Sequence, residues 1–140
     1  MTESAPLKTV MLIDDEGVDR MIYRRVLNRS KLVDEVIEFE YARDALEYLR
    51  GPGRPQVCLI FLDINMPGMN GFEFLEAATA EFGESFADAV VIMLTTSLAP
   101  NDVDRSKRYA AVKDYISKPL TVEDVHHAAD VVRQMRKQVA

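Results

Sequence analysis

Five side chains that could handle phosphate stand just after apolar segments of this chain. They are Asp14, Asp15, Asp63, Thr95 and Lys118. Carboxylates that share one small patch repel each other, and a hard divalent cation such as Mg²⁺ relieves that repulsion because it prefers oxygen ligands. A lysine ammonium and a threonine hydroxyl beside the acids can bind phosphoryl oxygens. We therefore expect phosphoryl-transfer chemistry, in which a protein mainly positions groups and neutralises charge.

Asp63 is the candidate for the reacting group. The stretch IFLDINMPGMNG, residues 60–71, runs as an apolar strand into this one carboxylate and then turns through Asn, Pro and Gly. A carboxylate can act as the nucleophile in phosphoryl transfer and become an aspartyl phosphate. Asn65, two residues later, offers a backbone carbonyl to a metal. Taken alone, Asp63 could also be a plain turn residue, since Asp is common in such stretches.

The elements that must bring these residues together alternate between strand and helix patterns. The expected strands are 8–13, 34–40, 57–62, 89–94 and 112–116. The expected helices are 14–30, 42–50, 72–82, 100–110 and 121–138. Strict alternation predicts an α/β fold, a doubly wound parallel sheet of five strands with five helices on its two faces. Ligands of such sheets bind beyond the carboxyl ends of the strands, where the five candidate side chains stand.

The first and last helices carry more specific patterns. Apolar residues recur at helical spacing in the first helix and predict its inward face. They are Val18, Met21, Ile22 and Val26, with Tyr23 and Leu27 as further candidates. In the last helix, Thr121 is placed as the N-cap and Asp124 follows three residues on, which predicts a variant of the capping box.

Length and composition limit the class of protein. The 140 residues fit one domain, 8–140, after a disordered lead of residues 1–7. A hydrophobic fraction of 48% is enough for a core without disulfides, and the single Cys58 is interpreted as a reduced core thiol. The net charge of −6 disfavours nucleic acid and anionic membranes as partners. No signal peptide or membrane-spanning run is visible, so we expect a cytoplasmic protein.

Four motifs, in order along the chain, resemble one known family. LIDDE at 12–16, FLDINMPGMNG at 61–71, MLTTS at 93–97 and YISKPL at 115–120 are similar to the receiver domain of two-component response regulators, in its stand-alone, single-domain form. The resemblance covers about residues 8–137. It implies a flavodoxin-like sheet with strand order 2-1-3-4-5, in which the first strand lies beside the third and their carboxyl ends meet.

The resemblance implies a role for each matching acidic residue. Asp63 would be the phosphoacceptor. Mg²⁺ would be held by Asp15, by Asp63 and by the backbone carbonyl of Asn65, while Asp14 would act on the metal through water.

The same resemblance assigns the residues that respond to phosphate. Thr95 would be the switch hydroxyl, Lys118 would bind the phosphoryl group, and Tyr115 would turn inward when Thr95 moves toward phosphate. The Lys118–Pro119 peptide bond would be cis. Without the resemblance, Tyr115 could also be a plain core residue and Thr95 a simple strand former.

The resemblance also implies a function. The chain would be a response regulator phosphorylated on Asp63 by a histidine kinase or a histidine phosphotransfer protein. It would not be an enzyme beyond its own phosphorylation and dephosphorylation. Because no effector segment follows residue 140, output would pass through a downstream protein target, read from a monomer or a homodimer.

Other functions remain open at this point. The chain could be a phosphorelay intermediate or a phosphate sink, including one for a phytochrome-type kinase. An aspartate-nucleophile phosphatase would need a second acid two residues after the nucleophile, and this chain has Asn65 there. An interaction module that is never phosphorylated would not need the acids together with Thr95 and Lys118.

Overall fold

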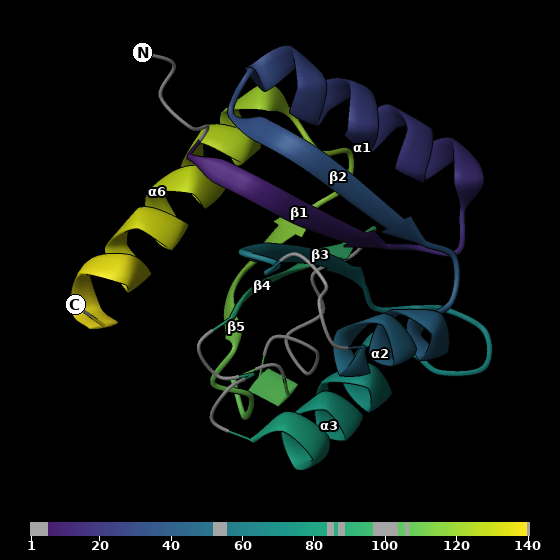
Figure 1. Ribbon diagram of the computed structural model, residues 1–140. Helices are drawn as coiled ribbons and strands as arrows, with labels where there is room; N and C mark the ends of the chain where they lie inside the picture. Colours follow the sequence, from purple (N-terminus) through teal and green to yellow (C-terminus); the bar gives the residue numbers. More distant parts are fainter. Residues whose placement is uncertain are drawn as a thin grey trace.

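Five parallel strands form one sheet in the order β2-β1-β3-β4-β5 in the computed structural model, as expected from the family resemblance (Figure 1). The structure describes residues 6–51, 56–83, 86, 89–96, 104–105 and 107–139. The strands are β1 (Leu7–Ile13), β2 (Val33–Phe39), β3 (Leu59–Asp63), β4 (Val90–Thr95) and β5 (Val112–Ser117). Within these residues the helices are α1 (Gly17–Ser30), α2 (Ala42–Arg50), α3 (Gly71–Phe82) and α6 (Val122–Val139).

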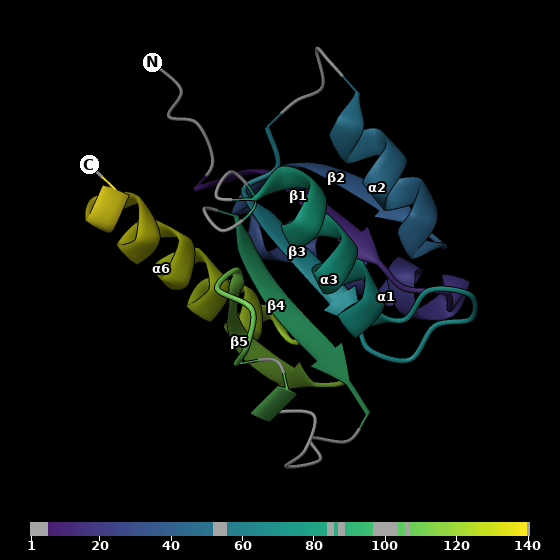
Figure 2. The same cartoon turned by 90° about the horizontal axis from the view of Figure 1, so that it is seen from below.

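Helices cover both faces of the sheet, and each face has its own apolar core. Helices α1 and α6 lie on one face and α2 and α3 on the other (Figures 1 and 2). Along β3, Leu59 and Phe61 belong to the α1 and α6 core, whereas Ile60 and Leu62 belong to the α2 and α3 core. Every residue of β3 and β4 is buried, as expected for strands with continuous apolar sequence that are covered on both faces.

The register of the strands determines which side chains are neighbours at the carboxyl edge of the sheet. Ile13 of β1 is aligned with Leu62 of β3, so the next residues, Asp14 and Asp63, leave the sheet side by side. Thr95 of β4 is aligned with Ser117 of β5, and the Lys118 N–H donates to the Thr95 carbonyl oxygen at 2.8 Å. The carboxyl edge of the sheet therefore brings together the strand ends that carry the candidate residues.

Two capping boxes begin helices at this edge or close to it. In α3, the Asn70 side chain accepts from the Glu73 N–H at 2.9 Å, and the Glu73 carboxylate accepts from the Asn70 N–H at 3.1 Å. In α6, Thr121 and Asp124 make the same reciprocal pair at 3.1 and 2.9 Å, which confirms the cap predicted there. Each box satisfies helix N–H groups that would otherwise lack partners.

Gly71, the first residue of α3, packs against the backbone that carries Asp63. A Cβ at this position would lie 2.6 Å from the Asp63 carbonyl oxygen and 3.1 Å from the Ile64 Cα. The Gly71 N–H donates to the Ile64 carbonyl oxygen at 2.9 Å. The loop after Asp63 is thus closed by a contact that leaves room only for glycine.

The predicted inward face of α1 was partly wrong. Val18 and Ile22 are exposed, at 63% and 37% of their surface, while Tyr23 and Leu27 are the buried residues. Tyr23 and Leu27 stand four residues apart and share one helix face, and their larger side chains fill the space between α1 and the sheet. Val26 lies half-buried beside them and packs against the same core.

The start of the domain also differs by one residue from the expectation. Leu7, assigned to the disordered lead, is the first residue of β1 and is fully buried. Its N–H donates to the Leu32 carbonyl oxygen at 2.9 Å, which pairs the beginning of β1 with the segment entering β2. Residues 1–5 lie outside the described part of the chain.

The fourth expected helix, 100–110, falls mostly outside the described residues. Residues 104 and 105 are helical, but 107–110 are not, so the prediction was wrong for these last four. The Arg108 N–H donates to the Arg105 carbonyl oxygen and the Val112 N–H to that of Tyr109, at 3.2 and 3.1 Å. Both bonds span three residues and form turns that lead into β5.

Candidate functional site

Three carboxylates gather at the carboxyl edge of β1 and β3. Asp14 and Asp15 follow β1 and Asp63 ends β3, and one oxygen from each lies within 4.8 Å of the others. Asp14 and Asp63 are buried, whereas Asp15 is half-buried. We call these three residues and Lys118 the acid pocket. The predicted convergence of the strand ends is confirmed, while the chemical roles of the residues stay predictions.

Lys118 reaches into the acid pocket from the segment after β5. Its Nζ lies 3.0 Å from an Asp14 carboxylate oxygen and 3.3 Å from an Asp63 oxygen. A third carboxylate, that of Asp19 in the first turn of α1, lies 3.2 Å away. The side chain of Lys118 is only 12% exposed, so these ion pairs are shielded from bulk water. One ammonium therefore faces three carboxylates.

The charges of the pocket are incompletely balanced. Burial, followed by the negative charge of Asp14, raises the pKa of Asp63 from 3.8 to about 6, although Lys118 opposes both effects. Burial likewise raises the pKa of Asp14, against the hydrogen bonds from the Glu16 N–H and from Lys118. Burial alone would lower the pKa of Lys118, but the neighbouring Asp14 and Asp63 outweigh it and raise that pKa. One lysine is thus too little positive charge for the acids around it.

The donor set of the acid pocket fits a hard divalent cation. Three carboxylates offer oxygen ligands within a small space, and Mg²⁺ is typically bound through one or two such groups and water. Burial and then the negative charge of Asp14 raise the pKa of Asp63, and a bound cation would oppose both effects. Asp14, Asp15 and Asp63 are the side chains that would hold it.

The remaining residues predicted for the site stand on or after β3, β4 and β5. Thr95 is buried at the end of β4, and Tyr115 is half-buried in β5, where it packs against the α2 and α3 core. Asn65 is exposed two residues after Asp63. The Lys118–Pro119 bond is cis, as the resemblance implied.

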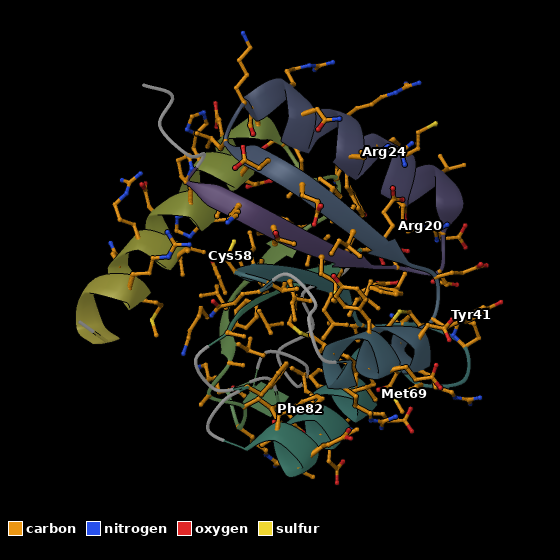
Figure 3. All side chains as sticks on the ribbon, viewed as in Figure 1. Arg20, Arg24, Tyr41, Cys58, Met69 and Phe82 are labelled. Atoms are coloured by element: carbon orange, nitrogen blue, oxygen red, sulfur yellow. The ribbon has the colours of Figure 1, made fainter. Side chains whose placement is uncertain are left out.

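Sequence reasoning missed two residues of α1 that touch the site. Asp19 contacts the Lys118 ammonium, and Arg20 donates a hydrogen bond to the Asp14 carbonyl oxygen at 2.6 Å. Arg20 also forms an ion pair with Glu38 of β2, at 3.4 Å. Arg24, one turn later in α1, is a second ion-pair partner of Glu38. Both arginines are labelled on α1 in Figure 3. The only signal for Asp19 was an acid in a first helical turn, which the helix dipole explains without any site.

The hydroxyl of Tyr23, one helical turn after Asp19, lies near the charges of Lys118, Asp14 and Asp19. The Tyr23 side chain is 2% exposed, and its hydroxyl makes no hydrogen bond of ordinary geometry among the described residues, although it lies close enough to the Lys118 ammonium to interact with it. Burial raises the pKa of Tyr23 well above its usual value, against the smaller effect of the Lys118 ammonium, while Asp14 and Asp19 raise it further. The periodicity of α1 pointed to this residue only as a core candidate.

Comparison with known proteins assigns the family. A sequence model described as the response regulator receiver domain matches residues 10–130. The chain belongs to this family. As a receiver domain it is a signalling protein that interacts with histidine kinases or phosphotransfer proteins, and receiver domains bind Mg²⁺ at an acidic pocket.

Individual relatives and structures agree with this assignment. The rice protein "Two-component response regulator ORR6" (Oryza sativa subsp. japonica) is 31% identical over 124 residues, which cover 89% of this receiver domain and 70% of the rice protein. Other curated relatives are matched over between 20% and 81% of their own length. Activities of their remaining segments therefore belong to those proteins.

Two solved structures show the same fold. The crystal structure of a two-component response regulator from Cytophaga hutchinsonii superposes with a TM-score of 0.83 at 27% identity, covering 91% of this receiver domain and 98% of the other. The bacteriophytochrome response regulator RtBRR has a TM-score of 0.73 at 30% identity, covering 90% and 77%. Among the described residues, none of the receiver helices combines the length and the apolar character needed to cross a membrane.

Proposed function

We propose that this receiver domain accepts a phosphoryl group on Asp63 from a histidine kinase or a histidine phosphotransfer protein, and then signals through contacts with other proteins. The observation that carries the proposal is the position of the Asp63 carboxylate at a strand end, with the Lys118 ammonium 3.3 Å away and two further acids beside it. Asp63 is buried at the end of β3, so its carboxylate is shielded from bulk water.

The acids of the pocket would hold Mg²⁺ through Asp15, Asp63 and the Asn65 backbone carbonyl, with Asp14 acting through water. Bound Mg²⁺ would supply the positive charge that the acids lack and that the transferred phosphoryl group needs. Asp14 also keeps Lys118 directed at the pocket through their 3.0 Å hydrogen bond. This arrangement stabilises charge by positioned groups, as phosphoryl transfer requires.

In the transfer step, a carboxylate oxygen of Asp63 attacks the phosphorus of a phosphohistidine. A P–O bond forms while the P–N bond breaks, and the imidazole keeps the electron pair of that bond. Asp63 must be ionised to attack, and since its pKa is about 6 without metal, most of it is ionised at neutral pH. Lys118 then donates to a phosphoryl oxygen of the aspartyl phosphate.

The switch would run from Thr95 to Tyr115. The Thr95 hydroxyl would bind a phosphoryl oxygen, and Tyr115, half-buried on the neighbouring strand, would fill the space that Thr95 leaves. The surface of β5 and α6 would then differ between the two states, and a downstream target would bind one state better. Phosphate shifts the population because it makes different contacts in the two packings.

We propose a phytochrome-type kinase as the phosphoryl donor of this domain. The supporting observation is the 30% identity to the bacteriophytochrome response regulator RtBRR. A histidine kinase draws its phosphoryl group from ATP, so a cytoplasmic location follows from this partner. In that setting the domain could also serve as a phosphorelay intermediate or a phosphate sink.

The proposal is tested by phosphorylation with a small-molecule donor. Incubation with Mg²⁺ and acetyl phosphate should add about 80 Da, the mass of one phosphoryl group, and intact-mass spectrometry should detect it. The adduct should be absent from Asp63→Ala and present in Asp34→Ala, a matched change at an exposed acid of β2. It should also be absent when EDTA removes Mg²⁺.

Other outcomes would overturn the proposal. Rapid turnover of a phosphoester without a stable adduct would favour an aspartate-nucleophile phosphatase. Absence of both the adduct and any Mg²⁺-induced rise in melting temperature would favour a module that is never phosphorylated.

A further inference from the structure

The Lys118 ammonium has as many carboxylate neighbours as it has N–H groups. An ammonium donates at most three hydrogen bonds. Here its Nζ bonds Asp14 at 3.0 Å and Asp19 at 3.2 Å, and pairs with Asp63 at 3.3 Å. In this state the ammonium is therefore surrounded by carboxylates, with hydrogen bonds to two of them and an ion pair with the third.

A phosphoryl oxygen must compete with these three carboxylates for the ammonium, and the three contacts are unequal. Their side chains are 2% exposed for Asp14, 8% for Asp63 and 33% for Asp19. A buried carboxylate that loses its cation is strongly destabilised, whereas water replaces the lost partner of a more exposed one. Asp19 is therefore the contact that the site can release most easily.

We propose that Asp19 is a positioning residue that holds Lys118 in the unphosphorylated state and competes with the phosphoryl group for its ammonium. The inference rests on the proposed role of Asp63 as phosphoacceptor. It makes the first turn of α1 part of the switch. The strength of the Asp19–Lys118 pair then sets how far the unphosphorylated state is favoured.

Tyr23 provides a second observation at the same place. Its buried hydroxyl makes no hydrogen bond of ordinary geometry within the described residues, and a buried polar group in that condition is destabilising. Asp19 precedes Tyr23 by four residues, which puts both on one face of α1. Once Lys118 turns to phosphate, the Asp19 carboxylate becomes free to accept a hydrogen bond from the Tyr23 hydroxyl. Tyr23 thus favours the state in which Asp19 is released.

The test measures affinity for beryllofluoride, a stable analogue of the aspartyl phosphoryl group, in saturating Mg²⁺ by ¹H–¹⁵N NMR titration. Asp19→Asn keeps the shape of the side chain and removes its charge. It should bind beryllofluoride about twofold to fivefold more tightly than the unaltered protein, as expected for loss of a partly exposed ion pair. Asp19→Glu keeps the carboxylate and should return the affinity toward that of the unaltered protein.

A matched control separates this contact from a general change of charge. Glu16 is exposed at the N-cap of α1, makes no side-chain capping bond, and is not among the ion-pair partners of Lys118 in the described residues. Glu16→Gln should leave beryllofluoride affinity within about twofold of the unaltered protein, because an exposed charge near a site is screened by salt. Equal tightening by Glu16→Gln and Asp19→Asn would overturn the proposal.

Tyr23→Phe should act in the opposite direction. Loss of the hydroxyl should weaken beryllofluoride binding about twofold to fivefold, and thermal unfolding in EDTA should show no loss of stability, since the hydroxyl makes no hydrogen bond of ordinary geometry to the described residues. In an Asp19→Ala background the same change should have no effect, because the acceptor is gone. An undiminished Tyr23→Phe effect in that background would contradict the proposed coupling.

The experiment distinguishes failure of the proposed function of Asp63 from failure of the proposed role of Asp19. If the unaltered protein does not bind beryllofluoride at Asp63, the proposed function fails. If it binds and Asp19→Asn binds no more tightly, the role of Asp63 stands and the role of Asp19 is refuted.

Discussion

The candidate site residues at the carboxyl edge of the sheet stand on strands that differ greatly in burial. Asp63 ends β3 and Thr95 ends β4, and every residue of these two strands is buried. Lys118 follows β5, in which only Ile116 is buried. The cause is position, since β3 and β4 lie inside the sheet while β5 lies at its edge. The acid that would receive phosphate is thus held in the best-packed part of the molecule.

The edge strand is held by polar contacts in place of a second neighbouring strand. The pairing of β4 with β5 shifts register between Val91 and Ile92. On β5, the Asp114 carboxylate accepts from the Tyr115 N–H at 2.8 Å and contacts His127 of α6 at 2.6 Å. Such contacts are weaker than core packing, so rearrangement at the edge is energetically easier than in the centre. The comparison teaches that the proposed phosphoacceptor and the Thr95 hydroxyl are held by core strands, whereas Tyr115 and Lys118 lie on or beside the edge strand, where movement costs less.

The largest expected effect comes from the buried charge of Asp63. Asp63→Asn should raise the free energy of unfolding by up to about 3 kcal/mol at pH 7.5 in EDTA, because a pKa raised from 3.8 to about 6 corresponds to that much unfavourable charge burial. Because the pKa of Asp63 is raised in the folded state, its carboxyl group stabilises the fold fully below about pH 4. This stabilisation is lost as the pH rises through about 6. The advantage of Asp63→Asn should therefore shrink as pH falls from 7.5 toward 4, as urea denaturation can measure. An advantage that does not change with pH would contradict this origin.

A matched pair of core changes tests the packing difference directly. Val91 of β4 and Val112 of β5 are register partners, but Val91 is fully buried and Val112 is half-buried. Val91→Ala should cost about 2 to 3 kcal/mol of stability and Val112→Ala about 1 kcal/mol, from lost apolar burial and the remaining cavity. Urea denaturation of both variants gives the comparison. Equal losses would show that the two strands are equally well packed.

Substitutions in the two capping boxes should have the same effect on stability but different effects on the rate of phosphorylation. Asn70→Ala and Thr121→Ala should each cost about 1 kcal/mol, because each removes a side-chain acceptor at a helix start. Only Asn70→Ala should also slow phosphorylation by acetyl phosphate, since Asn70 precedes Gly71, which packs on the Asp63 backbone. Thermal unfolding and intact-mass kinetics on the same samples measure the two effects. Equal slowing by Thr121→Ala would indicate a general loss of folding instead.

The smallest effect is expected at the edge strand. The Asp114–His127 pair is exposed, at 32% and 56% of the two side chains. His127→Ala should change the free energy of unfolding by less than about 0.5 kcal/mol, as is usual for such surface pairs. His126→Ala, an exposed neighbour on α6, is the matched control. A loss above 1 kcal/mol for His127 alone would mean that the edge strand depends on this pair far more than its exposure indicates.

Sequence patterns predicted the parts of the molecule in which local signals are strong. The continuous apolar runs became β3 and β4 within two residues at each end, and Thr121 and Asp124 formed the expected cap. The pattern was weaker in α1, where six apolar residues occupy more than one face. The structure buries Tyr23 and Leu27 and exposes Val18. Periodicity alone could not choose between these faces, because the choice depends on the shape of the sheet beneath the helix.

The amino-acid sequence by itself determined the alternation of strands and helices, and with it which acids, hydroxyl and ammonium must stand at strand ends. These follow from local chemistry, since apolar periodicity and turn residues act over a few positions. Only the tertiary structure decided that Asp19, Arg20 and Tyr23 belong to the same site. They meet Lys118 and Asp14 because α1 packs against α6 and β2 in one orientation about its own axis. That orientation is set by packing between residues distant in the chain, which no local pattern records.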